Sequence, residues 1–252
     1  MSWDAESSTV NLAELGTGTC QFKDAMLVTD EKHEGSSSMR VSVNEGQGDD
    51  GCVNVFPQRN YGHALNTGAT IHYRWWMKIQ SSFNWGTEHQ KTKAGRIKQA
   101  TEVNPIYFSS NLHKTGISLQ CAGCEPGFSG GEKTILRYDF NPSTNPAVTN
   151  WQEYIVQFRW QTGSNFDAEA RLYVNGKLVA SFLNWRVYSG SGMANGVEGF
   201  SDGMMLQSYS QLCSASCPGV GGFVWLDDFS VDDSWNSNAV ARPLPPTMLP
   251  AK

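Results

Sequence analysis

The segment Ile71–Lys98, IHYRWWMKIQSSFNWGTEHQKTKAGRIK, begins with a strand pattern and ends in a run of basic residues. Its first nine residues alternate so as to predict a β-strand with one apolar and one polar face. The apolar face consists of Ile71, Tyr73, Trp75, Met77 and Ile79. The polar face consists of His72, Arg74, Trp76 and Lys78. The apolar face is expected to pack on a second sheet, whereas cations around an indole are unusual for a face that meets only water.

The charge of this segment differs from that of the rest of the chain. From Arg74 to Lys98 there are six basic residues and one acidic residue, a local charge of +5. The whole chain carries −5, so the remainder carries −10. A basic island in an acidic protein favours a polyanionic ligand. The net charge argues against nucleic acid as that ligand.

Composition predicts an all-β fold. Aromatic residues make up 12% of the 252 residues, there are 25 glycines, and no convincing helical run occurs. Short alternating segments continue to the strand Phe223–Val231, and Asn175-Gly176 predicts a two-residue hairpin turn. We therefore expect an antiparallel two-sheet β-sandwich or jelly roll of the concanavalin A-like kind, as one domain over residues 1–233. Residues 234–252 read as a Pro-rich tail or linker.

Six cysteines indicate disulfides and an oxidising compartment. Cys20 and Cys52 are expected to tie the first strands together. Cys121 and Cys124, like Cys213 and Cys217, either close small loops or pair between the two loops. A zinc site is the alternative, although the ligand spacing fits it poorly. We expect a secreted monomer whose signal peptide is not part of this sequence, with no membrane span.

Several common catalytic patterns do not occur in the sequence. The Glu-x-Asp-x-x-Glu strand of sandwich glucanases, the Gly-x-Ser-x-Gly elbow and the His-Glu-x-x-His zinc motif are all missing. The cations fit β-elimination on a uronate polymer better. That reaction requires a group that neutralises the sugar carboxylate, a base, and an acid for the leaving oxygen.

Candidate residues for such a site come mainly from the opening segment. The expected catalytic residues are Lys93, Lys91, His72, Arg74, Tyr107 and Arg137. The expected substrate-binding residues are Trp76, Lys78, Trp85, His89, Arg96, Lys98, Ser118 and Gln120. The alternative for the cations is a solvated charged face, and for Arg137 an ion pair with Asp139.

The chain resembles the jelly-roll polysaccharide lyases of the alginate and glucuronan lyase type, families 14 and 20, and related lyase-like sandwiches. The resemblance rests on the order of its elements. These are YRWWMKI, FNWG and a lysine-bearing segment, GISLQ before ILRYDF, the stretch WQEYIVQFRWQTGSNFDAEARLYVNGKLV, and GFVWLDDFSV. It implies β-elimination on an anionic polysaccharide such as alginate or glucuronan, with no cofactor required for catalysis.

The sequence departs from the family pattern at three places. QKTKAGRIK stands where the family has Gly-Gly-Lys-Leu-Pro-Gly-Leu, so either Lys91 or Lys93 matches the family's lysine. The expected serine and arginine correspond to Ser118 and Gln120, so the arginine is missing. Of the family's tyrosine pair only Tyr138 is present near LRYDF.

Acidic residues suggest a structural Ca²⁺, as in lectin-like sandwiches. Asp227 and Asp228 would be joined by Asp4 or Glu6, because carboxylate oxygens are the ligands that Ca²⁺ prefers. The alternative is capping at the end of a strand. Two other functions also stay open for the whole chain: a non-catalytic, lectin-like carbohydrate-binding module, and a structural sandwich domain of a surface or viral assembly.

Overall fold

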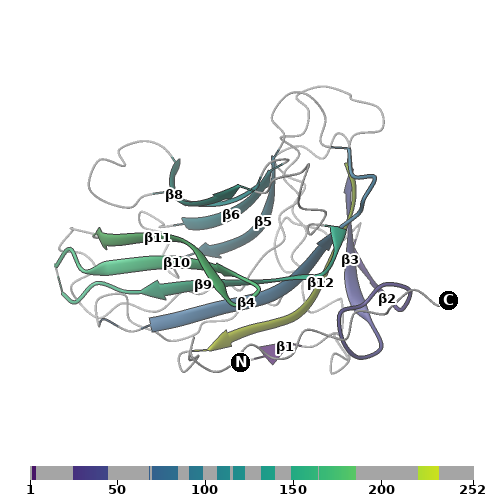
Figure 1. Ribbon diagram of the computed structural model, residues 1–252, viewed down its shortest axis with the longest axis horizontal. Coiled ribbons are helices and arrows are strands. Elements are labelled where there is room, and N and C mark those ends of the chain that lie inside the picture. The colour runs from purple at the N-terminus through teal and green to yellow at the C-terminus, as the bar shows by residue number, and fades with distance from the viewer. Residues whose placement is uncertain are drawn as a thin grey trace.

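Two antiparallel β-sheets stack on each other in a computed structural model of the chain (Figure 1). The structure describes residues 2–3, 25–44, 68, 70–84, 91–98, 107–113, 116–122, 132–139, 149–163, 165–185 and 221–232. These residues contain no α-helix, which confirms the all-β prediction. No helix among them is long and apolar enough to cross a bilayer.

The larger sheet has eight strands in the order β11-β10-β9-β4-β12-β3-β2, with β1 paired to β12. Their bounds are β1 Ser2–Trp3, β2 Ala25–Val28, β3 Ser38–Asn44, β4 Thr70–Ile79, β9 Gln152–Arg159, β10 Ala168–Val174, β11 Lys177–Trp185 and β12 Gly221–Asp232. The smaller sheet is a four-stranded meander of β5 Lys91–Lys98, β6 Tyr107–His113, β7 Gly116–Ala122 and β8 Glu132–Asp139. The segment Ile71–Lys98 thus supplies most of a central strand of one sheet and an edge strand of the other.

The core lies between the sheets, on the apolar face of β4. Tyr73 and Trp75 are fully buried, as predicted, and the Trp75 ring stacks on Tyr154 of β9 with centroids 5.5 Å apart. Burial raises the pKa of Tyr154, and the neighbouring Tyr138 of β8 raises it further. Tyr138 pairs with the buried Ile117 and therefore belongs to the core side of β8, and β8 lies against β10 and β11. Aromatic burial of this extent dominates the stability of a small sandwich.

The β10–β11 hairpin confirms the turn that its two central residues predict. Asn175 and Gly176 have φ angles of 50° and 74°, the left-handed conformation that a tight two-residue turn requires. Asn175 also fastens the turn to β9, because its side-chain oxygen accepts the Glu153 N–H at 2.9 Å and its own N–H donates to the Glu153 carbonyl at 2.9 Å. The turn therefore fixes three consecutive strands of the larger sheet.

Strand β5 differs from the sequence expectation. The pattern predicts a loop through Thr92 and a short strand near Ile97, whereas the chain is extended from Lys91 to Lys98 and pairs with β6 throughout. Lysine-rich and glycine-containing strands give a weak strand signal, and here the pairing with β6 decides the conformation.

Candidate functional site

The polar side chains of β4 lie on the face of the larger sheet that points away from the core. His72 is 4% exposed, while Arg74, Trp76 and Lys78 are partly exposed. Arg74 Nε donates to Glu153 Oε1 of β9 at 2.5 Å. Lys78 Nζ lies 2.6 Å from Glu31 Oε2, in the loop before β3. The two cations of this face are thus paired with carboxylates of the chain itself.

Trp76 also has a partner from the loop before β3. The His33 ring stacks on its indole with centroids 3.6 Å apart and planes 16° apart. Trp151 meets His33 edge-on at 5.9 Å, and its Nε1 donates to Glu31 at 3.2 Å. Side chains of the protein therefore lie where the sequence predicts sugar stacking on Trp76.

A register shift in β12 presents two adjacent carboxylates beneath this loop. The shift lies between Asp227 and Ser230, and Asp228 takes a φ of 48°. The Asp227 side chain accepts the His33 N–H at 3.2 Å and the Asp228 N–H at 3.0 Å. Burial, and then the neighbouring Asp228, raise the pKa of Asp227 to about 6. Asp4 and Glu6, the other expected calcium ligands, lie outside the described residues.

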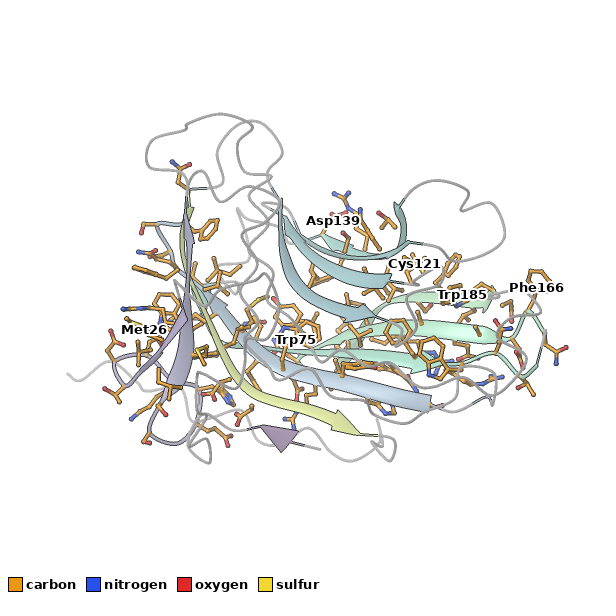
Figure 2. The ribbon with its side chains drawn as sticks, turned by 180° about the vertical axis from the view of Figure 1, so that it is seen from behind. Met26, Trp75, Cys121, Asp139, Phe166 and Trp185 are labelled. Carbon is orange, nitrogen blue, oxygen red and sulfur yellow. The ribbon has the colours of Figure 1, made fainter. Side chains whose placement is uncertain are left out.

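The smaller sheet carries the remaining predicted residues on one face. Ile117, Leu119 and Cys121 of β7 are at most 2% exposed and pair with the core side of β8. The positions between them belong to the opposite face, which points away from the larger sheet. Figure 2 shows this arrangement, with Cys121 between the sheets and Asp139 on the outer side. We call this outer side the basic face.

Strand register defines the rows of the basic face. One row consists of Lys93, Asn111, Ser118 and Arg137, from β5, β6, β7 and β8 in turn. The next row consists of Arg96, Ser109, Gln120 and Thr134. Lys98 pairs with Tyr107 in the row beyond, and Lys91 pairs with His113 on the other side. Partners directly opposite in a sheet occupy the same face, so the register assembles these positions into one surface.

A β-bulge on β5 is necessary for this surface. Strict alternation places Lys91 and Lys93 on one face and Arg96 and Lys98 on the other. The register shifts between Lys93 and Gly95, so that Asn111 faces Lys93 and Ser109 faces Arg96. Because Asn111 and Ser109 are two residues apart on β6, all four basic positions fall on the basic face.

Arg137 projects from the basic face into solvent. Its guanidinium Nε lies 2.6 Å from Asp139 Oδ1, and the two side chains are 56% and 61% exposed. Ser118, its partner on β7, is buried, with 2% of its surface exposed. Gln120 Nε2 donates a hydrogen bond to Thr134 Oγ1 at 3.4 Å. The arginine that the resemblance places at Gln120 is missing there, but Arg137 stands directly opposite Ser118 on the next strand.

The structure therefore divides the predicted site residues between two sheets. His72, Arg74, Trp76 and Lys78 belong to the larger sheet. Lys91, Lys93, Arg96, Lys98, Tyr107, Ser118, Gln120 and Arg137 belong to the smaller sheet. Since the core lies between the sheets, the two groups face opposite sides of the sandwich. Trp85 and His89 lie outside the described residues.

Sequence reasoning missed Asn111 on the basic face and His33, which packs on the larger sheet from the loop before β3. Neither residue belongs to a sequence motif that indicates a functional role. Their contacts are made with residues that are distant in the sequence. Cys121 is buried and disulfide-bonded. Cys20, Cys52, Cys124, Cys213 and Cys217 lie outside the described residues, as does the predicted tail of residues 234–252, so the cysteine pairing stays a prediction.

Comparison with known proteins finds similarity in structure alone. No protein-family model and no curated protein matches the chain. An endo-β-1,4-glucuronan lyase from the fungus Trichoderma reesei superposes with a TM-score of 0.57 at 13% identity, covering 82% of this chain and 85% of that one. The cellulose-induced protein Cip1 gives 0.55 at 18% identity, with 93% and 97% covered. A marine PL-14 alginate lyase from Aplysia kurodai gives 0.54 at 11% identity, with 92% and 98% covered. The chain thus shares the β-sandwich fold of polysaccharide lyases.

Proposed function

We propose that the chain is a secreted polysaccharide lyase that cleaves a uronate polymer by β-elimination on the basic face. The observation that carries this proposal is the row Lys93–Asn111–Ser118–Arg137, which extends across all four strands of the smaller sheet. A cationic residue stands at each end of the row and small polar residues stand between them. The fold shared with a glucuronan lyase and an alginate lyase supports the same conclusion.

The chemistry of elimination explains why such a row is useful. The proton next to the uronate carboxylate becomes acidic enough to remove only when a cation or hydrogen-bond donors neutralise that carboxylate. Arg137 is suited to this role because a guanidinium presents a planar fork of donors to a carboxylate. Its pair with Asp139 is solvent-exposed, and such pairs contribute little stability, so Asp139 can give way to the carboxylate of the polymer.

The remaining steps require a base and an acid. We assign Lys93 to proton transfer, because it shares the row of Arg137, and Tyr107 is the alternative two rows away. Strands are about 4.8 Å apart, so the backbones of Lys93 and Arg137 are separated by about 14 Å. A polymer that crosses the row between them would meet a cation on each side.

Turnover measurements on two variants test this proposal. Lys93→Ala and Arg137→Ala are each expected to reduce kcat/KM on polyglucuronate or alginate by about 100-fold or more, as for loss of one preorganised electrostatic group. The ultraviolet absorbance of the unsaturated uronate product reports the rate. Lys177→Ala is the matched control, because Lys177 is exposed in the hairpin of the larger sheet. Full activity of both site variants would overturn the proposed site.

The second candidate is a non-catalytic protein that binds anionic glycans on the same face. It is favoured by Gln120, which stands where the resemblance expects an arginine and hydrogen-bonds Thr134. Incubation with both polymers separates the two candidates. Unsaturated product supports the lyase, whereas binding that Arg137→Ala weakens, without any product, supports the binding protein.

A further inference from the structure

The carboxylates of Asp227 and Asp228 are the strongest feature that the proposed function does not use. Sandwiches of this kind are expected to hold Ca²⁺ at such a pair, and Ca²⁺ requires several oxygen lone pairs that converge on one point. The donor set around Asp227 and Asp228 therefore decides whether a dication fits there.

Both oxygens of the Asp227 carboxylate already accept backbone N–H groups of the chain. Its Oδ2 accepts the backbone N–H of His33 at 3.2 Å, and its Oδ1 accepts the backbone N–H of Asp228 at 3.0 Å. Each N–H occupies one lone pair of the carboxylate, which leaves fewer lone pairs for a cation that requires several. Among the residues that the structure describes, no group of three or more His, Cys, Asp or Glu side chains could hold a metal ion. The described residues therefore fit a hydrogen-bonded pair of carboxylates rather than a calcium site.

Asp228 already has a close partner as well. His33 Nδ1 lies 2.8 Å from Asp228 Oδ2. The His33 side chain is 3% exposed, stacked on Trp76 and in edge contact with Trp151. A ring held on two sides in this way cannot move aside without opening the loop before β3.

We propose that His33 takes the place of a calcium ion in this protein. Its backbone N–H holds Asp227, its ring nitrogen holds Asp228, and its ring packs on Trp76, so one residue joins the loop before β3 to β12 and β4. The strand-crossing link that a metal would supply is thus built from the chain itself. This inference is independent of the proposed lyase activity.

Thermal unfolding with and without calcium tests the inference. The unmodified protein is expected to show the same Tm in excess CaCl2 and in excess EDTA. His33→Ala is expected to lower Tm in both solutions by roughly 5 °C or more, since one lost kcal/mol shifts Tm by about 2–4 °C in a domain of this size. His33→Phe keeps a ring against Trp76 but removes the ring N–H, and is expected to recover only part of the loss.

Two results would overturn the inference. One is a Tm of the unmodified protein that rises with CaCl2 and no longer rises in Asp228→Asn, which would place calcium at the pair. The other is a Tm of His33→Phe equal to that of the unmodified protein, which would show that the contact with Asp228 stabilises nothing. If Tm rises with CaCl2 in Asp227→Asn and Asp228→Asn as much as in the unmodified protein, calcium binds at another site. That result agrees with the inference, because the two aspartates are then not calcium ligands. If a variant does not fold, the absence of binding heat when the unmodified protein is titrated with CaCl2 supports the inference.

Discussion

Trp76 illustrates how the environment of a residue changes its interpretation. In the sequence it is an indole among cations, the composition of a sugar-binding surface. In the structure its ring is stacked on His33, and the cations beside it are paired with Glu153 and Glu31. None of these three partners is close to β4 in sequence, so local patterns cannot predict them.

Arg74 provides a prediction at the residue scale. Arg74→Ala removes the partner of Glu153, whose side chain is only 14% exposed, and leaves a largely buried carboxylate without its guanidinium. We expect a loss of roughly 1–3 kcal/mol in the free energy of unfolding, measured by urea denaturation. The same variant should keep the catalytic rate of the unmodified protein, because Arg74 lies on the larger sheet. A large loss of rate with unchanged stability would place the active site on β4 instead.

Bulges and turns decide the surfaces at the scale of the elements. The bulge between Lys93 and Gly95 brings four basic positions of β5 onto one face, and the shift in β12 turns Asp227 and Asp228 toward His33. The spacing of the residues gives no sign of either irregularity. The Asn175-Gly176 turn, in contrast, follows directly from its two residues.

The turn allows backbone strain and side-chain bonding to be measured separately. Asn175→Gly keeps the left-handed φ of 50° but loses the hydrogen bonds of the amide to Glu153 and Gln152. Asn175→Ala loses these bonds and adds strain of about 1–2 kcal/mol. We expect both variants to be less stable than the unmodified protein, and Asn175→Ala to be the less stable of the two. Equal stabilities in chemical denaturation would show that the turn is not strained by alanine.

Charge is distributed unevenly over the molecule as a whole. A chain with a net charge of −5 places four basic positions of one strand on a single face of the smaller sheet. Such a face attracts a polyanion locally while the rest of the chain repels it.

Salt therefore provides a prediction at the scale of the whole molecule. The affinity for polyglucuronate or alginate is expected to fall as NaCl increases from low to physiological concentration, because the Debye length shortens from about 30 Å to about 8 Å. Calorimetric titration of the Lys93→Ala variant, whose turnover is expected to be strongly reduced, measures this affinity. Arg137→Ala should weaken the dependence and Lys177→Ala should leave it unchanged. An affinity independent of salt would contradict recognition by the basic face.

The amino-acid sequence alone determined the all-β class, the buried face of β4, the hairpin at Asn175 and the presence of a basic segment. These properties depend on alternation, turn chemistry and composition, all of which are local. The tertiary structure decided that β4 and β5 belong to different sheets, which basic residues share a face, and that His33 covers Trp76. Those outcomes depend on strand pairing and on contacts between distant segments, because the register of one strand is set by its neighbours in the sheet.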